Sequence, residues 1–172
     1  EKAAGGIQLL GVGESSDAHH MSAPDPQGRG AVLAIRDALQ KAKLTSESIQ
    51  YVNLHGTGTR LNDEIEARAM QTIFENPPPC SSTKPLTGHC LGVSGALEAG
   101  ICWLALSKAA DYNGRIPLPP HWWDGAADES FPELALTQTG QSIAAQADIC
   151  MMSSSFAFGG NNVALIMGSD FG

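Results

Sequence analysis

Basic residues are scarce in this 172-residue sequence, which has ten lysines and arginines against 18 aspartates and glutamates and a formal net charge of −8. Nucleic-acid binding needs a basic surface that neutralises phosphates, so we expect no nucleic-acid partner. No apolar run reaches the ~18 residues of a membrane-spanning helix, so we expect no membrane span. The residues contain no secretory signal, although a piece of a longer protein could have lost one, and the expected location is the cytoplasm.

The sequence also lacks the spacing of a metal site or a disulfide framework. Its four cysteines have no CxxC pair and no zinc-like combination with histidine; they are Cys80, Cys90, Cys102 and Cys150. Four thiols in a chain of this size do not indicate disulfide bonds, and reduced thiols are the simplest interpretation.

Charged residues of both signs make up only 16% of the sequence, whereas 42% of it is hydrophobic. The hydrophobic fraction can build the core of one domain. The low charge indicates that other protein covers much of the surface. The first residue is Glu1 rather than Met, and an apolar stretch begins almost at once at Ile7. We interpret the chain as a piece of a longer one, with trimming during expression as the alternative.

Hydrophobic periodicity predicts strands and helices in alternation. The expected strands are 6–12, 49–54, 80–82, 147–154 and 163–167, and the expected helices are 31–43, 63–74 and 93–109. The last of these helices is apolar nearly all round, which predicts burial between layers. This order of elements predicts an α/β fold with a mostly parallel sheet and helices on its faces.

Turn residues predict the connections between these elements. Residues 13–17 and 23–28 are expected to be loops. Residues 111–133 are expected to form a long loop that Trp122 and Trp123 anchor. Asp63 is expected to cap the helix at 63–74, with Glu66 as the second member of a capping box.

A His-Gly-Thr-Gly-Thr segment, residues 55–59, directly follows the strand at 49–54. Functional residues of alternating α/β folds collect at the C-terminal ends of strands, which makes His55 a candidate site residue. A plain turn with a surface histidine is the alternative.

A second candidate segment, residues 84–89, runs from Lys84 to His89 and opens the apolar helix. A helix N-terminus favours the neutral form of a histidine, and a neutral imidazole can donate to a developing oxyanion. Glu98 lies in the same helix among apolar residues, where a buried carboxylate needs a partner, and Lys84 is the expected one. The alternatives are a capping loop with a solvated lysine and an exposed carboxylate on the wet edge of the helix.

The third candidate segment, residues 156–162, reads Phe-Ala-Phe-Gly-Gly-Asn-Asn. Its glycines and asparagines allow more than one loop conformation, so that Phe158 could swing over a pocket. An ordinary hairpin turn between the last two strands is the alternative.

In this order and spacing, from Gly11 to Asn162, these segments resemble the C-terminal half of the beta-ketoacyl-ACP synthases. The resemblance implies a thiolase-like fold. Residues 1–172 would be the C-terminal βαβαβαββ half of a layered α-β-α-β-α architecture. The N-terminal half, with the catalytic cysteine, would be absent from this chain.

The resemblance also implies roles for the candidate residues. His55 and His89 would hydrogen-bond the malonyl thioester carbonyl and stabilise its enolate. Lys84 and Glu98 would complete the catalytic set, as a charged pair that orders the histidine loop. The implied substrate-binding residues are Thr57 and Thr59 at the pantetheine arm, Phe158 as a gate, and Asp17 near the site. No metal or organic cofactor is implied.

The implied reaction is a decarboxylative Claisen condensation of an acyl-enzyme thioester with malonyl-ACP, in fatty-acid or polyketide synthesis. The implied partners are acyl carrier protein, the N-terminal half, and a second ketoacyl synthase in a homodimer or heterodimer. This fragment alone is expected to be inactive, because none of its cysteines has the nucleophile's sequence context. The alternatives are an inactive partner resembling a chain-length factor, and an interaction module whose half-fold another chain completes.

The sequence departs from the family pattern at three positions. Cys90, directly after His89, stands where the family has another residue, and we interpret it as a packing residue. Ala157 stands in place of a usual glycine, and its methyl group is expected to restrict the gating loop. Asn161 stands in place of a usual threonine.

Overall fold

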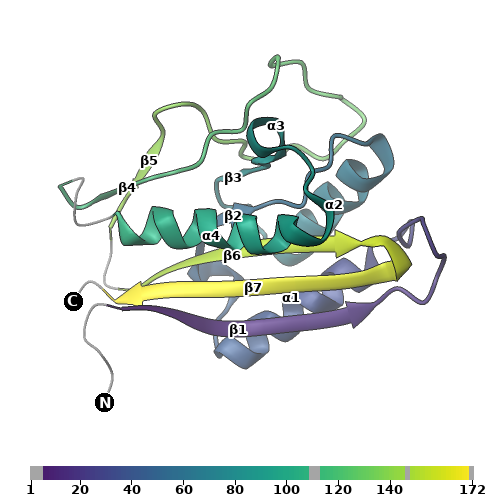
Figure 1. Ribbon diagram of the computed structural model, residues 1–172, viewed down its shortest axis with the longest axis horizontal. Helices are drawn as coiled ribbons and strands as arrows, with labels where there is room; N and C mark the ends of the chain where they lie inside the picture. Colours follow the sequence, from purple (N-terminus) through teal and green to yellow (C-terminus); the bar gives the residue numbers. More distant parts are fainter. Residues whose placement is uncertain (1–5, 109–112, 146–147, 171–172) are drawn as a thin grey trace.

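The structure is a computed structural model that describes residues 6–108, 113–145 and 148–170 (Figure 1). A five-stranded sheet forms its centre, in the order β1-β7-β6-β2-β3. The strands are β1 (Ile7–Ser16), β2 (Ile49–Asn53), β3 (Cys80–Ser81), β6 (Asp148–Ala157) and β7 (Asn161–Asp170). Two short strands, β4 (Arg115–Pro117) and β5 (Ser142–Ala144), pair separately.

The sheet is mixed rather than mostly parallel, since β7 is antiparallel to both β1 and β6, whereas β2 is parallel to both β6 and β3. The hairpin between β6 and β7 causes the difference, because it places a reversed strand between β1 and β6. The other strands, β1, β6, β2 and β3, all run in one direction. Their C-terminal ends therefore meet at one edge of the sheet.

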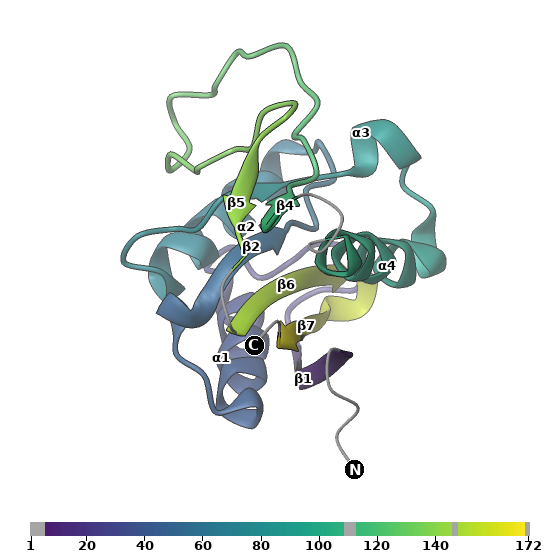
Figure 2. The same cartoon turned by 90° about the vertical axis from the view of Figure 1, so that its left-hand side faces the viewer.

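Helices cover both faces of the sheet (Figure 2). On one face, α1 (Arg29–Ala42) and α2 (Arg60–Ile73) pack over a core that includes Val52 and Met152. On the other, α4 (Ser94–Ser107) packs over a core that includes Tyr51 and Met151. Neighbouring residues of one strand serve opposite cores because side chains alternate along a strand.

Short helices complete the described fold, and all lie in connections. They are α3 (Lys84–Thr87) and the 3₁₀ turns η1 (Ser46–Ser48), η2 (Leu91–Val93) and η4 (Phe158–Gly160). None of the helices in the described ranges combines the length and hydrophobicity that crossing a bilayer requires.

Two local predictions about β1 and α2 were wrong. The predicted turn at 13–17 is mostly strand, because the pairing of β1 with β7 continues to Ser16 opposite Asn161. The predicted capping box is absent, because α2 begins at Arg60 with Thr59 as its N-cap. Glu66 therefore lies inside the helix, where it has other partners.

The apolar helix α4 is not buried all round in this chain. Leu97, Trp103 and Leu104 are 37%, 49% and 51% exposed. The face of α4 opposite the sheet thus presents large apolar side chains that the described part of this chain leaves uncovered.

The described part of the segment at 111–133 is mostly loop, as predicted, with β4 as its strand, but its anchoring residues differ from the prediction. Trp122 and Trp123 are 60% and 43% exposed and do not anchor it by burial. Ile116 and Leu118 enter the core under α4 instead. The predicted helix end at Ala109, the start of the long loop at 111–112 and the strand start at Ala147 lie outside the described residues.

Candidate functional site

The candidate residues collect at the edge where β1, β6, β2 and β3 end. Asp17 follows β1, His55 follows β2, Lys84 begins α3 after β3, and Phe158 begins η4 after β6. His89 lies between α3 and η2 and reaches the same region, since its ring centroid is 5.8 Å from that of His55. Segments far apart in sequence thus meet because their strands run in one direction.

The two imidazole rings are perpendicular, at an interplanar angle of 89°. His55 is buried, with 6% of its surface exposed, and its other ring neighbour is Phe156 at 5.9 Å. His89 is exposed in this chain. The ring of His55 therefore lies at the buried side of the site, and the ring of His89 lies at its solvent-exposed side.

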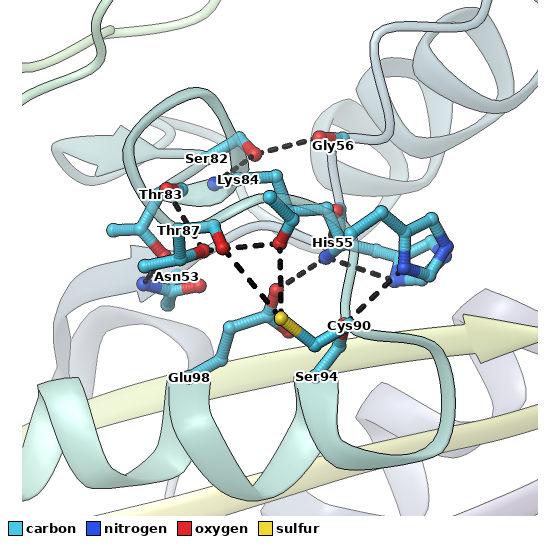
Figure 3. A network of polar contacts seen from close by, with 12 residues as sticks. Asn53, His55, Gly56, Ser82, Thr83, Lys84, Thr87, Cys90, Ser94 and Glu98 are labelled. Carbon is cyan, nitrogen blue, oxygen red and sulfur yellow. Dashed lines mark hydrogen bonds and ion pairs between the residues drawn. The ribbon is translucent and has the colours of Figure 1, made fainter.

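Lys84 connects His55 to α4, as Figure 3 shows. Its Nζ forms an ion pair with Glu98 Oε1 and donates to the backbone carbonyl oxygen of His55. Both partners of the ion pair are buried, Lys84 at 6% and Glu98 at 1% exposed. Burial raises the pKa of Glu98, and the hydrogen bond and charge of Lys84 lower it. The expected pairing of Lys84 with Glu98 is therefore present.

His55 is held in the neutral form. Burial lowers its pKa to about 3, and the charges of Lys84 and His89 contribute in the same direction. The Lys84 ammonium lies 3.4 Å from His55 Nδ1 and can only donate, so Nδ1 is the unprotonated nitrogen. The proton of His55 is then on Nε2.

The same reasoning assigns the tautomer of neutral His89. The backbone N–H of Leu91 donates to its Nδ1 at 3.3 Å, and the hydroxyl of Ser94, at the start of α4, lies 3.2 Å away. Leu91 has a left-handed φ of 49°, which is uncommon for a leucine. Both imidazoles thus use Nδ1 for protein contacts, and within the described residues each Nε2–H remains available as a donor.

Glu66 of α2 fixes the loop that carries His55. Its carboxylate oxygens accept the backbone N–H groups of His55, at 2.8 Å, and of Gly56, at 2.7 Å. Burial raises the pKa of Glu66 to about 7, against the effect of these two donors. Sequence reasoning assigned this side chain to a helix cap. The available signal was a pair of carboxylates, Asp63 and Glu66, soon after a glycine-rich loop.

Replacing Glu66 with alanine is expected to destabilise the protein, because it leaves two backbone N–H groups without their acceptor. Each buried donor left unpaired costs about 1–3 kcal/mol. Thermal or denaturant unfolding measures the loss. Glu64→Ala is the matched control, since Glu64 forms an ion pair with Arg68 on the exposed side of the same helix. Such pairs contribute at most about 1 kcal/mol. Equal stability of the two variants would contradict this role of Glu66.

Among the described residues, the contacts of the other predicted site residues are with groups other than the two imidazoles. Asp17 accepts Asn162 Nδ2 at 2.7 Å and the Asp25 N–H at 2.8 Å. Its own N–H donates to the Gly160 carbonyl at 2.8 Å. Its backbone N–H thus ties the end of β1 to η4, and both of its carboxylate oxygens bind protein groups, one of them Asn162 at the start of β7.

Thr57 and Thr59 lie on the partly exposed loop after His55, with their hydroxyl oxygens 2.8 Å apart. Phe158 is 75% exposed, and it is Phe156 whose ring contacts His55. Ala157 has an extended backbone, with φ −109° and ψ 165°, which any residue adopts without strain, and the expected restriction of the loop stays a prediction.

The four thiols are free. Burial raises the pKa of Cys80 and Cys102 to about 12, and it also raises the pKa of Cys150. Cys90 is exposed in this chain, with Sγ 3.6 Å from the Thr87 carbonyl oxygen, so it does not pack in the core of the described residues. In the segments that the structure describes, no cluster of His, Cys, Asp and Glu could hold a metal ion.

Comparison with known proteins identifies relatives of this chain. Residues 7–110 match the family described as "Beta-ketoacyl synthase, C-terminal domain". The chain is 39% identical over 168 residues to the mitochondrial 3-oxoacyl-[acyl-carrier-protein] synthase of Arabidopsis thaliana, in an alignment that covers 94% of this chain and 34% of that protein. It is 38% identical over 162 residues to 3-oxoacyl-[acyl-carrier-protein] synthase 2 of Synechocystis sp., covering 92% and 36%. The chain thus spans about a third of the length of these relatives.

Two solved structures are similar over nearly the whole chain. One is a ketosynthase (ApeO) in complex with its chain length factor (ApeC) from Xenorhabdus doucetiae, with 52% identity, a TM-score of 0.83, and coverage of 95% of this chain and 39% of that one. The other is the ishigamide ketosynthase/chain length factor, with 32% identity, a TM-score of 0.80, and coverage of 95% and 38%. The predicted α/β fold of the thiolase-like type is confirmed by this likeness.

Proposed function

The chain belongs to the beta-ketoacyl synthase family, and on that premise we propose that its residues are the C-terminal half-domain of an enzyme that condenses an acyl-enzyme thioester with malonyl-ACP. Relatives named 3-oxoacyl-[acyl-carrier-protein] synthases support this reaction class, which serves fatty-acid or polyketide synthesis. The observation that carries the proposal is the meeting of His55 and His89, each with Nε2–H free.

The two donors suit the chemistry of decarboxylation. When the bond between the malonyl α-carbon and its carboxylate breaks, CO2 leaves and the electron pair moves onto the thioester carbonyl, giving an enolate. Two N–H groups aimed at that oxygen stabilise the charge as it develops. The enolate carbon then attacks the acyl thioester, and the cysteine thiolate leaves. Every step proceeds without a metal or an organic cofactor.

A neutral His55 fits donation better than proton transfer. With its pKa lowered to about 3 by burial and by Lys84, the ring carries no charge over the range in which enzymes work. We assign His55 and His89 as donors to the thioester oxygen. Lys84 and Glu98 are positioning residues, since Lys84 holds the carbonyl of His55.

The remaining candidates have supporting roles in the proposal. Thr57 is half-buried and Thr59 is exposed, both soon after His55, where their hydroxyls could bind the amide groups of a pantetheine arm. Phe158 lies on a turn with left-handed glycines, Gly159 at φ 79° and Gly160 at φ 73°, which suits a movable gate. Asp17 anchors that turn.

The exposed apolar residues next to the site form a surface on which the proposed N-terminal half could pack. Leu91 and Val93 are 71% and 64% exposed beside His89, and Leu97, Trp103 and Leu104 continue the surface along α4. Large exposed apolar surfaces mark protein contacts. We propose that the N-terminal half packs here and brings the nucleophilic cysteine to the two histidines. A homodimer, or a heterodimer with a second ketoacyl synthase, is the proposed assembly, and acyl carrier protein is the proposed substrate carrier.

The isolated 172-residue chain is expected to show no condensing activity with acyl- and malonyl-carrier, because it lacks the nucleophile. Product formation followed by mass spectrometry tests this, with the full-length protein as the positive control. Turnover by the isolated chain would show that one of its own cysteines acts as the nucleophile.

An inactive chain-length-factor-like subunit is the second candidate, since both similar structures contain such a factor. Acylation separates the two functions. The full-length protein, incubated with acyl-carrier, should gain the mass of the acyl group and then release CO2 from malonyl-carrier. A protein that does neither by itself, yet restores product formation to a separate synthase, would be the partner subunit.

A further inference from the structure

Ser82 is the junction between the two loops that carry the site. It follows β3 and is 2% exposed. Its hydroxyl donates to the Gly56 carbonyl at 2.6 Å and accepts the Lys84 N–H at 3.3 Å (Figure 3). A Cβ atom on Gly56 would lie only 2.5 Å from Ser82 Cβ. The position of Ser82 therefore sets the spacing between the His55 loop and the Lys84 loop.

The backbone N–H of Ser82 is held by a histidine from a third segment. It donates to His121 Nδ1 at 3.1 Å. His121 is itself fixed, since its N–H donates to the Thr137 carbonyl at 2.9 Å, and Thr137 in turn donates to the Cys80 carbonyl at 2.9 Å. A backbone N–H can only donate, so Nδ1 of His121 must be unprotonated for this contact to exist.

The surroundings of the ring favour that neutral form. Burial lowers the pKa of His121, and the charge of Asp63 on α2 opposes this. The ring also contacts Trp123, which carries no charge, with the two ring centroids 5.6 Å apart. Thr137, from the segment before β5, offers a backbone carbonyl rather than a charge. Among the described residues, Asp63 is thus the charged group that acts on the pKa of His121.

We propose that His121 is a positioning residue for the two-histidine site, which in its neutral form holds Ser82 and through it the spacing of the His55 and Lys84 loops. The inference rests on the proposed function for its catalytic consequence. Protonation of Nδ1 would place two donors face to face and release Ser82. Misplacement of reacting groups by about 1 Å can cost about 100-fold in rate. Neutral His121 is therefore a requirement for full activity.

The test compares two substitutions in the full-length protein. His121→Asn keeps an acceptor near the position of Nδ1 and does not titrate, whereas His121→Leu removes the acceptor. We expect His121→Leu to lower kcat for malonyl-carrier decarboxylation about 10- to 100-fold with little change in KM, by the same sensitivity to misplacement. We expect the kcat of His121→Asn to stay within a few fold of the wild-type value. The acid limb of its profile of kcat against pH should move to lower pH. His19→Leu, at an exposed histidine, is the control.

Amide hydrogen exchange at Ser82 gives a readout that does not depend on activity. It should accelerate in His121→Leu and remain slow in His121→Asn, with unfolding curves confirming that both variants are folded. Unchanged kcat and unchanged exchange in folded His121→Leu would overturn the proposal, as would equal losses in both variants. If wild type itself released no CO2, the proposed function would fail, and the exchange of Ser82 would still decide whether His121 holds it.

Discussion

Replacement of His89 by alanine is expected to lower the rate of malonyl-carrier decarboxylation by about 10²- to 10³-fold, the typical loss for one oxyanion donor. The ring of His89 lies 5.8 Å from that of His55 and presents Nε2–H because Leu91 donates to Nδ1. Removing it leaves one donor for the enolate oxygen. Release of CO2 by the full-length protein, measured under single-turnover conditions, reports this step directly.

The control for this experiment keeps a donor in place. In His89→Gln the side-chain amide can reach the position of Nε2–H, so we expect a smaller loss than in His89→Ala. Formation of the acyl-enzyme should be nearly unaffected in both variants, because the proposal gives that step to the other half. CO2 release near the wild-type rate in His89→Ala would remove His89 from the mechanism.

The residues that sequence alone could identify are those whose position follows from strand direction. His55 and Lys84 each come shortly after the end of a strand, β2 and β3, and these two strands point the same way. A pattern of strands and helices therefore predicts that they share an edge. The pairing of Lys84 with Glu98 was also accessible, because a carboxylate in an apolar helix needs a cation.

The residues that sequence could not identify act through contacts set by the tertiary fold. Glu66 was expected to cap its own helix, a local role, but α2 begins at Arg60 and its carboxylate instead reaches the preceding loop. His121 lies 39 positions from Ser82, and nothing in the sequence pairs them. The composition of residues 13–16 is typical of a turn, but pairing with β7 outweighs that tendency.

The buried ion pair allows a second large effect to be predicted. Lys84→Met is expected to destabilise the full-length protein by about 3–5 kcal/mol, because it leaves the Glu98 carboxylate buried without its cation. Glu98 is 1% exposed, and its second oxygen, Oε2, already has no hydrogen-bond partner in the part of the chain that the structure describes. Denaturant unfolding measures the change. Lys41→Met, which breaks the exposed Lys41–Asp37 pair on α1, should cost at most about 1 kcal/mol.

The double variant Lys84→Met with Glu98→Leu separates stability from chemistry. Replacing a whole buried ion pair by apolar residues of similar volume is often neutral, so we expect most of the lost stability to return. Decarboxylation should remain slow, because the carbonyl of His55 still lacks the donor that Lys84 provides. The pKa of His55 should also rise, since the charge of Lys84 is one cause of its depression. If the double variant regained activity together with stability, Lys84 would serve only to neutralise Glu98, and the order of the histidine site would have to come from Glu66 and Ser82 alone.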